Sequence, residues 1–273
     1  TEINLLLSAP LPNKVSLSGW LRDLGGWFGL ALAVNLFIRL AGLAEYPIYF
    51  FTDEAVQTIL ASDFVRDGFH NYDHEFLPTY FKNVYQYNLG VSVYLQIIPL
   101  LLFGKSVIVT RGVHVLVSLL AALCSGLALK RIFLNPHPWL AVLVLSATPA
   151  WFLHSRTAFE TSLAVSLYAG FLYCYMLYRG GQPRAIYAAL AFGALSFYSY
   201  SPAQMVLAVT GMLLLVSDFR YHWQQRRILA RALGLGLMLA LPYFRFQWEH
   251  PNESYNHLRQ IGSYWLQPIS LWD

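Results

Sequence analysis

The stretch VIVTRGVHVLVSLLAALCSGLAL, residues 107–129, decides the fold class. It contains a single charged residue, Arg111, and Lys130 and Arg131 follow it directly. An apolar run of about 20 residues is long enough to cross a bilayer as a helix, and basic residues at a helix end are typical of the cytoplasmic side. The stretch therefore predicts a transmembrane helix whose C-terminal end is cytoplasmic.

The composition of the whole chain agrees with a membrane protein. Charged residues make up 12% of the 273 residues, hydrophobic residues make up 57%, and the mean hydropathy is +0.46. Soluble domains usually carry about 25% charged residues, so too few charges are present here to cover a water-facing surface. This excludes an ordinary soluble enzyme, a disordered chain and a basic nucleic-acid-binding module. Cys124 and Cys174 lie inside apolar runs, and we interpret both as small buried apolar residues.

Six further apolar runs predict additional spans, because unpaired backbone groups in hydrocarbon strongly favour helices. The seven predicted crossings are Leu24–Ala44, Val107–Leu129, Trp139–Leu153, Phe159–Tyr178, Ala185–Ser199, Ala203–Ser217 and Ile228–Phe246. The basic clusters at their ends are Lys14 with Arg22, Lys130 with Arg131, Arg179 with Arg184, and Arg220 with Arg226 and Arg227. Placing all of these inside makes Leu89–Phe103 a helix that does not cross but lies at the outer interface or dips in and returns. We therefore expect an all-α integral membrane module over residues 1–273, with an outer loop at 45–106 that carries two juxtamembrane helices.

The outer loop holds seven of the fourteen acids of the chain: Glu45, Asp53, Glu54, Asp63, Asp67, Asp73 and Glu75. Thr52 is a suitable cap for a helix that begins at Asp53 and ends near Gly68. In one interpretation, Asp53 and Glu54 only complement the dipole of this helix. In the other, a carboxylate at the membrane surface accepts a proton from a hydroxyl or ligates a cation.

Two other groups in this loop are candidate sites. The first consists of possible metal ligands, His70, Asp73, His74 and Glu75, but their spacing matches no metal motif and a solvated loop is the alternative. The second is Lys82 among the tyrosines Tyr80, Tyr85, Tyr87 and Tyr94. These aromatic residues indicate either an interfacial belt or a surface on which a sugar stacks.

Ionisable residues at predicted membrane depth are costly and therefore suggest sites. Arg39, Arg111, Arg156 and Glu160 lie near the outer ends of predicted spans. Arg156 and Glu160 are four residues apart and can simply pair, whereas several arginines together can bind a phosphate. Tyr198, Tyr200 and Ser201 lie at a helix break before Pro202, where they either line the same cavity or only turn the chain.

The order of these features resembles the GT-C glycosyltransferases, in the branch of protein O-mannosyltransferases and lipid A aminoarabinose transferases. The residues that carry the resemblance are Asp53-Glu54-Ala55, Leu102-Phe103-Gly104, Arg111, Ser155 to Glu160, and Leu241-Pro242-Tyr243. In place of the Lys-Pro element of many members, this chain has Tyr87-Asn88-Leu89-Gly90. Family members are considerably longer, so we expect this chain to correspond to their N-terminal conserved module.

The resemblance implies a polyprenyl-phosphate sugar donor, an outward-facing site, inversion at the anomeric carbon and a catalytic carboxylate at Asp53, assisted by Glu54. It implies a hexosyl- or pentosyltransferase of the bacterial inner membrane and cell envelope, with a lipid, glycan or protein acceptor. We expect Arg111, Arg156 and Lys82 to bind the donor phosphate, and Glu160, Tyr87, Asn88, Tyr198 and Tyr200 to contact substrate. The sequence does not identify a cofactor; a divalent metal is compatible with it but is not required by it. The alternatives are a transporter or lipid flippase and a non-catalytic assembly subunit of the same fold.

Overall fold

The computed structural model describes residues 25–83 and 86–260, so Lys14, Arg22 and Tyr85 lie outside the described residues. The helices are α3 (Gly26–Leu40), α4 (Thr52–Arg66), α5 (Val91–Phe103), α6 (Val107–Arg131), α7 (Trp139–Ala147), α8 (Pro149–His154), α9 (Glu160–Arg179), α10 (Ala185–Phe197), α11 (Ser201–Ser217), α12 (Phe219–Gln224), α13 (Arg226–Glu249) and α14 (Glu253–Gln260). The strands are β1 (Tyr80–Asn83) and β2 (Gln86–Leu89).

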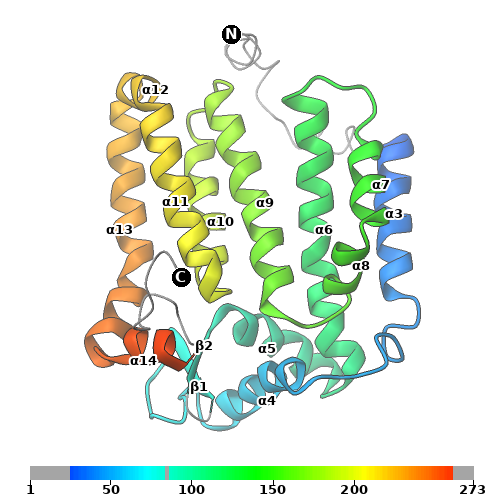
Figure 1. The fold of residues 1–273 in the computed structure, drawn as a ribbon, viewed down its shortest axis with the longest axis vertical. Coiled ribbons are helices and arrows are strands. Elements are labelled where there is room, and N and C mark those ends of the chain that lie inside the picture. Colours follow the sequence, from blue (N-terminus) through cyan, green and yellow to red (C-terminus); the bar gives the residue numbers. More distant parts are fainter. Residues whose placement is uncertain (1–24, 84–85, 261–273) are drawn as a thin grey trace, which may run out of the picture.

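The long helices form a bundle, and the acidic loop gathers at one end of it. Figure 1 shows α3, α6, α9, α10, α11 and α13 running along the bundle, while α4, α5, the two strands and α14 lie together below it. The basic residues at the end of α6, at the end of α9 and at the start of α13 lie at the opposite end. The acids of residues 45–106 and these basic turns therefore occupy opposite ends of the molecule.

Three helices in the described part of the chain are long and apolar enough to span a membrane on their own: α6, α9 and α13. The shorter apolar helices are α3, α5, α10 and α11. A helix of 13 residues such as α10 is only about 20 Å long, less than the ~30 Å hydrocarbon core of a bilayer. The fold is that of a mostly helical integral membrane protein, and the number of seven crossings stays a prediction.

Two features differ from the expectations. The predicted span Trp139–Leu153 is divided into α7 and α8 at Pro149, because a residue before proline is driven out of the helical region; Thr148 has the extended angles φ −75° and ψ 111°. The aromatic part of the loop forms an antiparallel hairpin in which Tyr80 pairs with Leu89 and Lys82 pairs with Tyr87. Gly90 follows this hairpin, and a Cβ atom there would lie 2.8 Å from the carbonyl oxygen of Thr79.

Separate apolar clusters hold the two ends of the molecule. The larger cluster joins α3, α6, α9 and α10 through residues such as Phe28, Leu127 and Tyr178. A second cluster lies between α4 and α5 and includes Phe64 and Phe81. A third packs the hairpin against α13: Tyr80, Leu89 and Phe246. The loop is thus attached both to α5 and to the last long helix.

Labelling of single cysteines tests the arrangement of the two ends. In a background in which the buried Cys124 and Cys174 are replaced by alanine, we expect Lys105→Cys and His137→Cys to react with an impermeant maleimide from opposite sides of the membrane. Both positions are exposed, and they lie at opposite ends of α6. Labelling from the same side in sealed vesicles would contradict a membrane-spanning α6.

Candidate functional site

A buried ion pair between Glu54 and Arg111 joins α4 to α6. Nε of Arg111 lies 2.9 Å from Oε2 of Glu54 and Nη2 lies 3.0 Å from Oε1, with both side chains 0% exposed. The other donors of Arg111 bind the carbonyl oxygens of Leu43 (3.1 Å), Pro47 (3.0 Å) and Tyr49 (2.9 Å). These contacts use all five N–H groups of a guanidinium. In this structure Arg111 therefore has no free N–H group to offer to the phosphate of the sugar donor, the role expected for it from the sequence.

The second partner of this pair is equally occupied. Oε2 of Glu54 also accepts a hydrogen bond from the backbone N–H of Ala158 (2.9 Å), and Oε1 accepts one from that of Phe51 (3.3 Å). The contact with Phe51 closes the first turn of α4 from the third helical position, as in a capping box. Thr52, the predicted cap, is instead the first residue of the helix. Both oxygens of Glu54 are thus occupied by Arg111 and by backbone N–H groups. The side chain positions the backbone and is not available to a substrate.

Arg156 holds the end of α3. It donates to the carbonyl oxygens of Ile38 (2.7 Å), Ala41 (2.8 Å) and Tyr46 (3.1 Å). Cations stabilise the carbonyl end of a helix, where backbone oxygens lack partners. Burial and the nearby charge of Arg111 lower the pKa of Arg156. In the described part of the chain Arg156 forms no salt bridge with Glu160, so the simple pairing considered from their spacing does not occur.

Asp53 is in the opposite situation from its neighbour Glu54. Its side chain is exposed in the first turn of α4, and within the described residues no donor is hydrogen-bonded to its carboxylate. It lies close enough to Glu160, the first residue of α9, for the two negative charges to interact. This places two carboxylates from sequence-distant segments at the same end of the bundle. Asp53 is available to accept a proton, and its position is fixed by the ion pair of the next residue.

The hairpin carries a second polar group, formed by Lys82, Asp73 and Tyr87. Nζ of Lys82 lies 2.8 Å from Oδ1 of Asp73, and the hydroxyl of Tyr87 donates to Oδ2 at 2.7 Å. Burial acts to raise the pKa of Asp73, but the hydrogen bonds from Lys82 and Tyr87 outweigh it and the pKa is lowered. Burial and the Asp73 carboxylate raise the pKa of Tyr87. The Lys82 side chain is 41% exposed and stays accessible to an anion.

Only one of the four predicted metal candidates has a suitable arrangement in the described chain. Glu75, Glu249 and His250 each offer a ligand atom, and these atoms lie within 4.8 Å of one another. His70 instead packs against Phe76, and His74 is exposed. Nothing in the sequence spacing of Glu249 and His250 shows that they meet Glu75.

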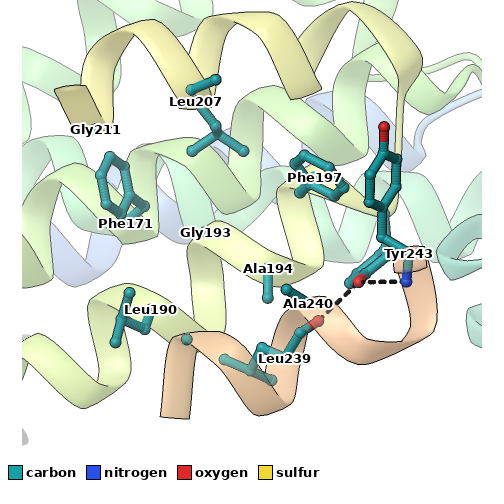
Figure 2. A pocket seen from close by; sticks show the side chains of 13 residues that line it. Phe171, Leu190, Gly193, Ala194, Phe197, Leu207, Gly211, Leu239, Ala240 and Tyr243 are labelled. Atoms are coloured by element: carbon teal, nitrogen blue, oxygen red, sulfur yellow. Dashed lines mark hydrogen bonds between the residues drawn. The ribbon is translucent and has the colours of Figure 1, made fainter. Parts of the chain in front are cut away.

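Two cavities lie beside α13. An apolar groove of about 310 Å³ is bounded by α9, α10, α11 and α13 (Figure 2), and its lining includes Phe171, Gly193, Leu207, Ala240 and Tyr243. A more polar cavity of about 410 Å³ lies at the hairpin end and is lined in part by Tyr87, Gln204, Tyr243 and Glu253. Tyr243 lines both, so the two cavities are neighbours. The apolar groove lies between helices of the bundle, and the more polar cavity lies beside the hairpin.

The predicted substrate residues are distributed unevenly around these cavities. Tyr87 lines the polar cavity, and Tyr198 lines the apolar groove, where its hydroxyl donates to the carbonyl oxygen of Leu239 at 2.7 Å. Asn88 is partly exposed on β2, and Tyr200 precedes α11 without lining either cavity. Sequence reasoning did not single out Gln204, whose amide donates to the Tyr80 hydroxyl at 3.0 Å. The sequence signal that could have indicated Gln204 is that it is an isolated amide side chain in an otherwise apolar helix.

Comparison with known proteins decides the fold. No family model matches the chain, and no curated protein matches its sequence. The structure of ArnT from Cupriavidus metallidurans in the apo state matches with a TM-score of 0.66 and 17% identity over 84% of this chain and 43% of that one. The same protein bound to undecaprenyl phosphate gives a TM-score of 0.65 and 17% identity over 92% of this chain and 45% of that one. This chain has the GT-C fold.

The GT-C assignment confirms the fold class predicted from the order of the motifs. The chain spans less than half the length of the ArnT structures that it resembles. At 17% identity the likeness concerns the fold, so the activity and its substrates have to be argued from the site.

Replacement of Glu54 tests whether the ion pair is structural. We expect Glu54→Gln to destabilise the protein by about 3–5 kcal/mol, because removing one partner of a buried pair leaves the other charge uncompensated. Thermal unfolding of the purified protein in detergent measures the change. Asp53→Asn is the matched control and should unfold close to the wild-type temperature, since no described residue donates a hydrogen bond to its exposed carboxylate. Equal stability of the two variants would refute the structural role of Glu54.

Proposed function

We propose that this protein is a membrane glycosyltransferase that moves a sugar from a polyprenyl-phosphate donor to an acceptor hydroxyl. The observation that carries the proposal is the division between two adjacent acids. The carboxylate of Glu54 is bound by Arg111 and by two backbone N–H groups. The carboxylate of Asp53, at the same end of the bundle, is exposed and accepts no hydrogen bond from any described residue. The GT-C fold supports this reading, because ArnT shares the fold and was crystallised with undecaprenyl phosphate.

Asp53 is the proposed general base. Its carboxylate takes the proton of the acceptor hydroxyl while the oxygen attacks the anomeric carbon, and the bond from that carbon to the phosphate oxygen breaks. The electron pair leaves with the polyprenyl phosphate, and the single displacement inverts the anomeric centre. General base catalysis by a positioned carboxylate typically contributes about 10²–10⁴-fold to the rate.

Lys82 and the two cavities are the proposed donor site. The lipid tail would occupy the apolar groove between α10, α11 and α13, and the phosphate and sugar would extend into the polar cavity beside Tyr243. Lys82 would leave its exposed contact with Asp73 to stabilise the charge that develops on the departing phosphate. Arg156 can contribute long-range positive charge but is engaged by carbonyl oxygens, and Arg111 is fully occupied.

The remaining assignments follow from the same reading. The acceptor would be a lipid, a glycan or a protein, and the transferred group a hexose or a pentose. The site would face the outer side of a bacterial inner membrane, because the acids lie at the end of the bundle opposite the basic turns. Tyr87 and Asn88 of the hairpin would contact the sugar, with no cofactor required for the displacement.

Transfer assays on Asp53 variants test the proposed base. We expect Asp53→Asn to lower transfer from radiolabelled polyprenyl-phosphate sugars by about 10²–10⁴-fold, because the amide cannot accept the proton. Membrane extracts with matched amounts of each variant provide the measurement. Asp67→Asn, at the other end of α4, is the control and should retain wild-type transfer. Undiminished transfer by Asp53→Asn would exclude the base, and undiminished biological function without any transfer would favour an assembly subunit.

Blocking the apolar groove tests the position of the lipid tail. We expect Ala240→Trp to fill the groove and to reduce photo-crosslinking by a diazirine-labelled polyprenyl phosphate, since Ala240 lines the groove. Met238→Trp is the matched control on the same helix, because Met238 is 67% exposed and does not line the groove. Equal crosslinking of both variants would place the tail elsewhere.

A further inference from the structure

The end of the last long helix meets the acidic loop in a mixed group of ligating side chains. Glu75 belongs to the loop before β1, while Glu249 ends α13 and His250 is its C-terminal cap. One atom from each lies within 4.8 Å of the others, although Glu75 and His250 are 175 residues apart in the sequence. A cluster assembled from such distant segments is a tertiary feature and is not a property of one acidic run.

Two of these side chains are already held in place. Oε1 of Glu75 lies 2.6 Å from Nε2 of His250, and Oε2 accepts a hydrogen bond from the amide of Asn71 at 2.7 Å. The Asn71 oxygen in turn accepts from the backbone N–H groups of Asp73 (3.0 Å) and Glu75 (2.9 Å), which fixes the loop. The His250 ring packs against the rings of Tyr87 and Phe246, with centroids 4.9 Å and 5.0 Å away. Partners of this kind orient metal ligands in known sites.

The third ligand is close but engaged elsewhere. Oε1 of Glu249 lies 3.0 Å from Nε of Arg245, and both side chains are about two-fifths exposed. Exposed pairs of this kind contribute little to stability, so Glu249 can turn toward His250 at small cost. Zinc binds nitrogen and oxygen ligands at about 2.0–2.2 Å, which sets neighbouring ligand atoms roughly 3–4 Å apart. The ligand atoms of Glu75 and His250, which lie 2.6 Å apart, therefore have to separate by about 0.4–1.4 Å as the ion enters.

We propose that Glu75, Glu249 and His250 form a Zn²⁺ site that locks α13 to the acidic loop. An imidazole with two carboxylates suits zinc, whereas Mg²⁺ and Ca²⁺ prefer oxygen ligands alone. Two glutamates offset the charge of the ion, and water fills its fourth position. The site joins Glu75, on the loop that also carries Asp73, to the helix that contributes Tyr243 and Phe246 to the polar cavity. The ion thereby fixes one wall of that cavity, and this inference does not depend on the proposed transfer reaction.

Metal binding to the purified chain tests the site. We expect the EDTA-treated protein, dialysed against ZnCl₂, to bind one Zn²⁺ per chain by elemental mass spectrometry. Glu75→Gln and His250→Gln should each weaken the affinity at least about tenfold, as even the loss of an outer-shell partner costs 10–100-fold. His70→Gln and His74→Asn are matched controls from the same loop, and asparagine tolerates the positive φ of 61° at position 74. Binding that is lost equally in the controls, or kept in both site variants, would overturn the proposal.

Glu249→Gln separates loss of a ligand from loss of the fold. This variant keeps the hydrogen bond between His250 and Glu75 that attaches α13 to the loop in the metal-free protein. With Co²⁺ as the probe, we expect visible d–d bands in the wild type and their loss in Glu249→Gln, with unchanged thermal unfolding of the two metal-free proteins. The same cobalt spectrum in both would remove Glu249 from the site and reject the three-ligand arrangement. None of these measurements involves sugar transfer. The zinc proposal can therefore be refuted without bearing on the proposed role of Asp53, and the reverse also holds.

Discussion

The ion pair between Glu54 and Arg111 is the contact on which the arrangement of the outer end depends. Taking two charges out of water costs several kcal/mol per ion, and the cost is offset only where every donor and acceptor finds a partner. Here Arg111 satisfies that condition by gathering three carbonyl oxygens from residues 43–49 in addition to both oxygens of Glu54. The chain between α3 and α4 is therefore wrapped around one guanidinium. The same contact sets the height and rotation of α4 relative to α6.

The rest of the inward face of α4 continues this polar attachment. The Gln57 amide nitrogen donates to the carbonyl oxygen of Ala158 at 2.8 Å, which leaves its oxygen to face Nε2 of His114 at 3.1 Å. At the next residue, the hydroxyl of Thr58 lies 2.6 Å from that of Thr110. Hydrogen bonds are directional, whereas apolar contacts tolerate sliding. A helix attached in this way has one register, as the proposed role of Asp53 requires.

The sequence predicted the helical membrane class, the helix after the first span and its end near Gly68, because these depend on local runs and caps. It did not predict which face of α4 is buried. Apolar Ile59 is 48% exposed, while polar Gln57 is 1% exposed, so burial does not follow polarity at these two positions. In a membrane protein lipid can cover apolar side chains, so hydrophobic periodicity no longer indicates which side faces the protein. The contact of Arg111 with Glu54 could not be predicted for a related reason: the two residues are 57 positions apart, and no local sequence pattern indicates that they meet.

The contrast between Asp53 and Glu54 follows from helix geometry and side-chain length. Successive residues on a helix point about 100° apart, so when one carboxylate faces α6 its neighbour cannot. Glutamate is one methylene longer than aspartate, and Glu54 uses this reach to contact Arg111 and the backbone of Ala158 together. The shorter Asp53 has fewer rotamers to lose, so its carboxylate wanders less once the backbone is fixed. The longer acid thus anchors the helix and fixes the backbone position of the shorter one, on which the proposed role of Asp53 as general base relies.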